Sequence, residues 1–173
     1  MSATTRTVYT VMDSPLGDLL LVGEKSGHSV LTLTSLSMPG QKNAPAIEGG
    51  WVRDPDSFQG IVGQLRAYFA SELTEFDIEF TVRGTEFQRR VWAELEQIPF
   101  GTSTTYGAVA GRLGLPPERI QAVGAAIGAN PLLLVRPCHR VIGADGRMRG
   151  YAGGVERKVE LLAHEGALQP SLM

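Results

Sequence analysis

The stretch Asn130-Pro131-Leu132-Leu133-Leu134-Val135-Arg136-Pro137-Cys138-His139-Arg140-Val141 is the segment around which the chain is organised. It contains the only cysteine of the protein and, next to it, one of three histidines. The apolar run from Leu132 to Val135 predicts a short buried strand. Pro137 ends that strand because proline has no N–H to give to a sheet. If Pro137 begins a helical turn, Cys138 follows among unpaired N–H groups, whose partial positive charge favours a thiolate.

A lone cysteine has two interpretations. Free cysteine is among the most buried residue types, so Cys138 could be an inert structural residue. A cysteine beside cations and an imidazole is instead typical of a reactive thiolate, and Arg136, His139 and Arg140 supply these groups. The residues of this stretch leave both interpretations open.

The motif Pro137-Cys138-His139-Arg140-Val141 resembles the signature of the O6-alkylguanine-DNA alkyltransferases, a family of direct-reversal DNA repair proteins. The similarity extends over about residues 85–167 as several blocks in the family's order. These blocks are Thr105-Tyr106-Gly107, Ala122-Val123-Gly124, Asn130-Pro131, Gly150-Tyr151-Ala152-Gly153-Gly154 and Leu161-Leu162-Ala163-His164-Glu165-Gly166.

The resemblance implies an α+β fold in two domains. A small N-terminal ribonuclease-H-like α/β domain is expected over residues 1–82. A mainly helical, winged-helix-like domain with a helix–turn–helix, which binds DNA and accepts the alkyl group, is expected over residues 83–173.

The resemblance also implies a single-turnover methylated-DNA–[protein]-cysteine S-methyltransferase. Its reaction is the irreversible transfer of an alkyl group from O6-alkylguanine, or from O4-alkylthymine, to Cys138 after base flipping. The expected partner is alkylated double-stranded DNA, and neither a cofactor nor a metal is expected. Two alternatives are an alkyltransferase-like module that binds the lesion without repairing it, and a regulator that senses alkylation through Cys138.

The catalytic residues follow from the same resemblance. Cys138 is the acceptor, and His139 deprotonates it through a water molecule. Glu165 orients and charges the imidazole, as in other nucleophile–histidine–carboxylate triads. Tyr106 helps to rotate the nucleotide out of the duplex and protonates the departing guanine.

A second set of residues is implied to contact the DNA or the flipped base. Asn130 resembles a hinge that ties the helix–turn–helix to the active-site segment. Tyr151 forms an aromatic wall, the Ala152 N–H approaches the guanine oxygen, and the Val141 carbonyl accepts from the guanine amine. The candidate DNA- and base-binding residues are Gln121, Asn130, Val141, Tyr151, Ala152, Arg119 and Arg140.

Two positions depart from the family pattern. Gln121 stands where the family usually has an arginine that fills the gap left by the flipped base. Arg119 lies about 200° away around the helix and cannot simply replace it. Arg136 stands where many relatives have an apolar residue, so a charge lies beside Cys138 unless the side chain reaches outward.

Turn residues and hydrophobic periodicity predict the other elements. Strands are expected over residues 6–12, 18–23, 30–34 and 76–82, with an exposed loop over residues 38–50. Helices are expected to begin at Asp54–Pro55 and at the Thr85–Gln88 capping box. Two further helices, over residues 106–113 and 118–129, form the helix–turn–helix, in which Gly124 and Gly128 are typical of close packing. A last helix, over residues 155–165, is expected to bury Val159 and Leu162.

The composition and the distribution of charge indicate the general kind of protein. With 43% hydrophobic and 20% charged residues the chain is an ordinary globular protein, and a cytoplasmic monomer without membrane contact is expected. The net charge of −2 is unevenly distributed: residues 1–80 carry −5 and residues 81–173 carry +3. Ten of the eleven cations in the second segment are arginines, which favours a DNA-facing C-terminal half.

Overall fold

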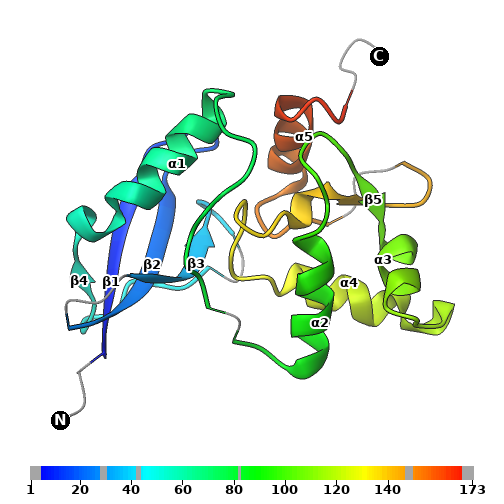
Figure 1. Ribbon diagram of the computed structural model, residues 1–173, viewed down its shortest axis with the longest axis horizontal. Helices are drawn as coiled ribbons and strands as arrows, with labels where there is room; N and C mark the ends of the chain where they lie inside the picture. Colours follow the sequence, from blue (N-terminus) through cyan, green and yellow to red (C-terminus); the bar gives the residue numbers. More distant parts are fainter. Residues whose placement is uncertain (1–4, 28–30, 42–43, 82, 147–149, 169–173) are drawn as a thin grey trace. The chain divides into compact units, whose positions relative to one another are not determined.

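The computed structural model describes residues 5–27, 31–41, 44–81, 83–146 and 150–168. The chain divides into two compact units, Met1–Thr81 and Val82–Met173. The first contains a small sheet with one long helix, and the second is mainly helical (Figure 1). The α+β class predicted from the sequence is therefore confirmed.

The first unit is built on a four-stranded sheet with the order β3-β2-β1-β4. Its strands are β1 (Thr5–Met12), β2 (Leu19–Ser26), β3 (Thr32–Ser37) and β4 (Val52–Arg53). β1, β2 and β3 pair antiparallel, whereas the short edge strand β4 runs parallel to β1. The turn between β1 and β2 closes where Gly17 takes a φ of 102° and the Ser14 hydroxyl donates to its carbonyl.

A single long helix completes this unit (Figure 1). As predicted, Asp54 caps the N-terminus and Pro55 follows, in a 3-10 turn, η1 (Pro55–Phe58), that leads into α1 (Gln59–Phe69). The Asp54 carboxylate accepts from the Ser57 N–H and hydroxyl, which lowers the pKa of this carboxyl. α1 buries Ile61, Leu65 and Tyr68 and lies along the end of β1.

The predicted strand over residues 76–82 is wrong. The segment touches the sheet only at Phe80, which forms an isolated parallel bridge with Leu33. Two hydrogen bonds hold it there, from the Leu33 N–H to the Glu79 carbonyl and from the Thr81 N–H to the Leu33 carbonyl. The alternation of apolar residues correctly predicted that one face of this segment is half-buried. It did not predict that the segment pairs with the sheet at a single residue. Val82 lies outside the described residues.

Three helices pack together in the second unit, namely α2 (Glu86–Leu95), α3 (Tyr106–Arg112) and α4 (Ile120–Gly128). The predicted capping box opens α2: the Thr85 hydroxyl accepts from the Gln88 N–H, and the Gln88 amide accepts from the Thr85 N–H. Trp92 is buried and donates its indole N–H to the Ala126 carbonyl at 2.8 Å. This bond ties α2 to α4.

The predicted helix–turn–helix is formed by α3 and α4, with a 3-10 turn, η2 (Pro117–Arg119), before α4. Gly124 packs as expected, because a Cβ there would lie 3.8 Å from the Tyr106 ring. Gly128 does not, since a Cβ there would meet nothing within 4 Å. The prediction of close packing is therefore wrong for Gly128.

A two-residue ladder joins distant parts of the second unit. β5 (Thr104–Thr105) pairs parallel with β6 (Val141–Ile142), Thr104 opposite Val141 and Thr105 opposite Ile142. Tyr106 follows β5 directly, and the Cys138–Arg140 turn precedes β6 directly. The ladder thus brings the start of α3 beside the cysteine segment.

The last helix, α5 (Val155–His164), buries Leu162 as predicted but not Val159. Leu161 and Leu162 are buried, but Val159 is 37% exposed. Lys158 is fully buried instead. The hydrophobicity pattern failed here because it assigns every lysine to the solvent side.

Gly23 offers a test of the sheet, since it sits at the bulge where β2 pairs with β3. A Cβ at this position would lie 2.7 Å from a Leu31 methyl and 2.9 Å from the Thr32 carbonyl. We expect Gly23→Ala to destabilise the protein by about 1–3 kcal/mol, because the clash involves backbone. Denaturant unfolding measures this change.

Gly63→Ala is the matched control, since a Cβ at Gly63 in α1 would meet nothing within 4 Å. It should leave stability unchanged or raise it by up to about 1 kcal/mol. Equal destabilisation by both substitutions would contradict the packing described at Gly23.

Candidate active site

The apolar run before the cysteine does not form the predicted strand. Residues 133–135 form a turn, and Leu134 takes a φ of 71°. A non-glycine residue in this left-handed region is strained and persists only where its surroundings hold it. The prediction that the run is buried is nevertheless confirmed, since Leu132, Leu133 and Leu134 are at most 2% exposed.

Asn130 holds this turn in place from inside. It is fully buried, and its side-chain oxygen accepts from the Leu132 N–H at 3.0 Å. Its amide nitrogen donates to the carbonyls of Leu132 and Arg136 at 3.3 and 3.1 Å. These bonds agree with the hinge role expected for Asn130, but a fully buried side chain does not reach DNA.

Cys138 begins a 3-10 turn, η3 (Cys138–Arg140), with Pro137 as its N-cap. The expectation of an unpaired N–H at Cys138 is wrong, because this N–H donates to the Arg136 carbonyl at 2.7 Å. The residue is only 4% exposed, and this burial raises the pKa of the thiol to about 11. A hydrogen bond from the Asn130 side chain and the charges of Lys158 and Arg136 act in the opposite direction. Cys138 at rest is therefore a protonated thiol.

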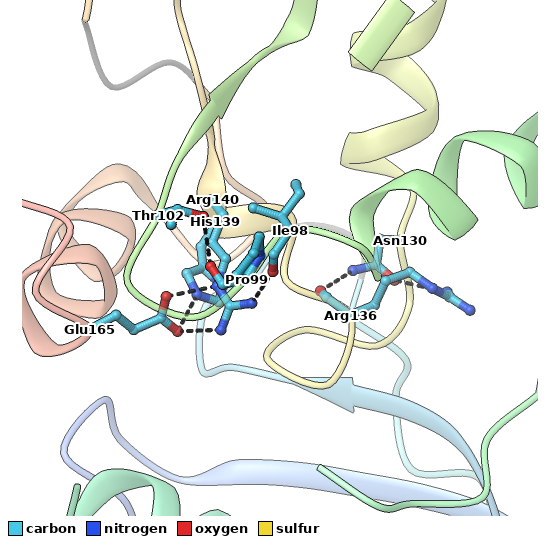
Figure 2. A network of polar contacts seen from close by, with 8 residues as sticks. All are labelled: Ile98, Pro99, Thr102, Asn130, Arg136, His139, Arg140 and Glu165. Atoms are coloured by element: carbon cyan, nitrogen blue, oxygen red, sulfur yellow. Dashed lines mark hydrogen bonds and ion pairs between the residues drawn. The ribbon is translucent and has the colours of Figure 1, made fainter. Parts of the chain in front are cut away.

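The side chains of His139 and Arg140 converge on one carboxylate, that of Glu165 at the end of α5 (Figure 2). His139 Nε2 lies 2.8 Å from Glu165 Oε2. Arg140 donates from Nε to Oε1 at 2.7 Å and from Nη2 to Oε2 at 3.0 Å. Glu165 is 4% exposed, and its carboxylate is thus matched by donors on both oxygens.

The prediction that Arg140 contacts DNA is wrong. Its guanidinium is buried, and Nη1 donates to the Ile98 carbonyl at 2.6 Å while Nε and Nη2 face Glu165. A planar fork directed inward at a carboxylate and a carbonyl is a structural clamp. The geometry therefore supports a role for Arg140 in holding Glu165 rather than a phosphate.

The aromatic side chains expected around the base lie in this region. The rings of Tyr151 and His139 are perpendicular with centroids 6.4 Å apart. Tyr106 is half-buried at the first position of α3. Val141 is fully buried and Ala152 half-buried.

Gln121, the residue expected in the gap of the flipped base, lies in the first turn of α4, and the candidate DNA contact Arg119 directly precedes this helix. Gln121 is exposed, as its expected contact with DNA requires. Arg119 is also exposed, but its guanidinium stacks over the Phe87 ring at 4.9 Å. That contact and its place before the helix make Arg119 a poor substitute for Gln121.

Lys158 belongs to the site although no sequence pattern pointed to it, and the position of Arg136 is settled by its burial. The Lys158 ammonium lies 5.7 Å from the Tyr106 ring centroid and donates to the Gly150 carbonyl at 3.3 Å. Burial lowers the pKa of Lys158 to about 8. Arg136 is 1% exposed and does not reach outward, so the charge expected beside Cys138 is present. The signal for Lys158 was weak: it is the only lysine among the eleven cations of residues 81–173.

Within the described ranges, no group of three or more His, Cys, Asp or Glu side chains could hold a metal ion. In the same part of the chain, none of the helices has the length and apolar character needed to span a membrane.

Fold and site together define a class of protein: a small sheet domain joined to a helix–turn–helix domain that buries a cysteine beside a histidine–carboxylate pair. Two family profiles match the chain accordingly. The 6-O-methylguanine DNA methyltransferase DNA binding domain matches residues 86–167, and the ribonuclease-like domain of the same proteins matches residues 7–82.

Individual proteins agree with these profiles. The chain is 49% identical over 163 residues, 94% of each chain, to a methylated-DNA–protein-cysteine methyltransferase of Mycolicibacterium paratuberculosis. It is 41% identical over 159 residues to a protein of the same name from Methanosarcina acetivorans, covering 92% of this chain and 98% of that one. The crystal structure of Mycobacterium tuberculosis OGT in complex with DNA superposes with a TM-score of 0.82 at 46% identity, covering 95% and 96%. The chain belongs to the 6-O-methylguanine DNA methyltransferase family.

Lys158 provides a test of the site. A buried ammonium is costly, and an apolar side chain of similar volume is often as stable or more stable. We expect Lys158→Met to raise the melting temperature, each kcal/mol gained being worth about 4–8 °C in a domain of this size. Alkyl transfer should become about tenfold slower or worse, since the charge that favours the thiolate is lost.

Arg157→Met removes a charge from the neighbouring position of α5, where the side chain is half-buried and donates to the Gly153 carbonyl. It should preserve the transfer rate. A Lys158→Met protein that melts lower and reacts at the normal rate would show that Lys158 is a structural residue alone.

Proposed function

We propose that the protein repairs DNA by direct reversal, transferring the alkyl group of O6-alkylguanine to Cys138 in a single, irreversible turnover. The observation that carries the proposal is a buried cysteine directly followed by a histidine whose ring is fixed by a buried carboxylate. The names of its relatives, methylated-DNA–protein-cysteine methyltransferases, support the same activity. O4-alkylthymine is a second candidate substrate.

The hydrogen bond between His139 and Glu165 determines which ring nitrogen can act as a base. A carboxylate only accepts, so the bond at 2.8 Å requires the proton on Nε2. In the neutral ring the lone pair is then on Nδ1, which is buried and has no hydrogen-bond partner within the described residues. Burial also lowers the pKa of His139, which keeps the ring neutral near pH 7. His139 is therefore prepared to accept a proton at Nδ1.

Alkyl transfer to Cys138 involves two proton transfers, one from the thiol and one to the guanine. The Cys138 thiol proton passes to His139 Nδ1 through a water molecule, and the sulfur attacks the alkyl carbon of the flipped base. A C–S bond forms as the bond from that carbon to O6 breaks. The departing guanine takes a proton from the Tyr106 phenol. Hydrolysis does not readily cleave the resulting thioether, so Cys138 is consumed.

Glu165 and Arg140 act on this step through His139. The Glu165 carboxylate stabilises the imidazolium that forms when Nδ1 is protonated. Arg140 fixes both carboxylate oxygens and so fixes the direction of the bond to the ring. We therefore assign Arg140 to the positioning of the base and not to DNA.

Access to the sulfur requires the base to leave the duplex, because a stacked O6-alkylguanine cannot reach a residue that is 4% exposed. We propose that α4 enters the DNA with Gln121 in the gap of the flipped base, and that Tyr151, Ala152 and Val141 border the base. The related OGT in complex with DNA supports duplex DNA as the partner. We further propose a monomer in the cytoplasm, where a reducing environment keeps the single thiol available.

Replacement of the acceptor tests the function directly. Cys138→Ser should abolish transfer while binding to methylated duplex persists, because the DNA contacts lie on other residues. Intact mass spectrometry after incubation with methylated DNA detects the added methyl group on wild type and its absence on the variant. Alkylated variant protein would refute the acceptor assignment, and a wild type that binds methylated DNA but keeps its mass would favour a lesion-binding module.

Gln121 determines how well the flipped state is held. Glutamine can bond to the orphaned partner base, but it is shorter than arginine and brings no charge into the groove. We expect Gln121→Arg to increase the single-turnover rate on duplex and Gln121→Ala to decrease it. On single strands, where flipping costs little, the three proteins should react alike.

Flipping costs on the order of a few kcal/mol, so duplex rates should differ by roughly tenfold or more. Arg119→Ala is the control, because Arg119 is stacked on Phe87. Identical duplex rates for all Gln121 variants, with a loss in Arg119→Ala, would transfer the role to Arg119.

A further inference from the structure

A guanidinium lies buried two residues before the cysteine. Arg136 is 1% exposed, and burial lowers the pKa of its side chain, which shows that the position is unfavourable for a charge. A charge kept in such a place must be matched by its neighbours.

The described neighbours of the Arg136 guanidinium include a buried amide, a carboxylate and an aromatic ring. Nη1 donates to the Asn130 side-chain oxygen at 3.1 Å, and both groups are buried. Nε donates to Glu96 Oε2 at 3.4 Å, a long bond to a side chain that is 35% exposed. The Cζ atom lies 4.7 Å from the centroid of the Trp92 ring. Of these two hydrogen bonds, the one to Asn130 is shorter and more buried. Its strength should therefore be reduced less by competing water.

The Trp92 ring, on which the guanidinium stacks, is held in place by its neighbours. Trp92 is 3% exposed, and its indole N–H donates to the Ala126 carbonyl of α4 at 2.8 Å. Gly84 lies so close to the ring that a Cβ there would be 2.5 Å from it. Because α2 and α4 fix the tryptophan, a guanidinium stacked on it has little freedom to move.

The consequence concerns the orientation of the Asn130 amide. Its oxygen accepts both from the Leu132 N–H and from Arg136, so its NH2 group must point the other way (Figure 2). There it donates to the Leu132 and Arg136 carbonyls, and the Arg136 carbonyl also accepts the Cys138 N–H at 2.7 Å. If the amide flipped, its NH2 would face a cation and its oxygen would face two carbonyls. The buried charge of Arg136 makes that flip unfavourable.

We propose that Arg136 is a positioning residue for alkyl transfer, whose guanidinium locks the Asn130 amide that holds the cysteine turn and keeps a positive charge two residues before Cys138. The inference rests on the proposed acceptor role of Cys138. A positive charge held close to the sulfur stabilises the thiolate over the thiol, so Arg136 favours the nucleophilic form. The other charged or titratable groups that surround the cysteine turn are Lys158, Glu96, His139, Arg140 and Glu165.

The test compares Arg136→Met, which keeps much of the volume, with Arg136→Lys, whose ammonium can still donate to Asn130. We expect Arg136→Met to lower the transfer rate about tenfold near neutral pH and to move the rising limb of the rate–pH profile to higher pH by about one unit. Arg136→Lys should recover most of both changes. Melting temperatures measured alongside identify a variant that fails to fold.

A second measurement needs no DNA. Cys138 is the only cysteine, so protein labelled with ¹³C at the cysteine β-carbon gives one resonance that reports the thiol titration. The wild-type pKa is about 11, and we expect the Arg136→Met thiol to remain protonated to still higher pH. Failure of the proposed function would appear as wild type that is never alkylated, and would leave this titration to judge Arg136 separately.

Glu96→Gln tests the effect of the Arg136 charge through its carboxylate partner. Because the Glu96 side chain is 35% exposed, this variant should fold. Removing the negative charge leaves the positive charge of Arg136 less compensated, so the thiol should titrate at lower pH than in wild type. Glu94→Gln, on the same helix and without any described contact to Arg136, is the control and should leave the titration unchanged. An unshifted thiol in Arg136→Met and Glu96→Gln, or an Arg136→Lys protein as slow as Arg136→Met at every pH, would overturn the proposal.

Discussion

A carboxylate buried without water has to be matched by donors, and the arrangement of the site depends on how Glu165 meets that requirement. Both of its oxygens accept from Arg140, and one also accepts from His139. The donors come from consecutive residues of one 3-10 turn, while the acceptor ends α5. The turn that starts with Cys138 can therefore take only one orientation against that helix. Because Arg140 also donates to the Ile98 carbonyl, the loop after α2 is fixed by the same guanidinium.

The cysteine turn is fixed from a second direction by Asn130 and Arg136, and the two arrangements have different chemical effects. The Glu165 arrangement prepares a base, because it keeps a neutral imidazole with its lone pair on Nδ1. The Asn130–Arg136 arrangement favours the nucleophile, because the Asn130 hydrogen bond and the Arg136 charge both lower the pKa of the thiol. Burial nevertheless keeps the thiol protonated, with a pKa of about 11. A protein that can react only once gains from this combination, since a thiol is less reactive than a thiolate.

The elements of the fold that the sequence predicted correctly are those specified by neighbouring residues. The Asp54 cap, the Thr85 capping box and the α3–turn–α4 unit were predicted because caps and turns are specified by neighbouring residues. The run Leu132–Val135 was wrong as a strand, because Asn130 bonds to backbone groups two and six residues further on and imposes a turn that includes a strained Leu134. Hydrophobicity does not report such side-chain bonds. The buried positions of Arg136, Arg140 and Lys158 could not be predicted, since no local pattern shows that a charged side chain has partners far along the chain.

Those three buried cations change the meaning of the charge distribution. The excess of positive charge in residues 81–173 was attributed to a surface that faces DNA. Three of its eleven cations lie inside the domain instead, two of them among the charges that favour the Cys138 thiolate. Buried positive charge stabilises an anion far better than the same charge in water, and both the thiolate and the departing guanine are anions. Part of the charge that suggested nucleic-acid binding therefore lies where it acts on the cysteine. The net charge of residues 81–173 thus overstates the positive charge that the surface of this unit can present to DNA.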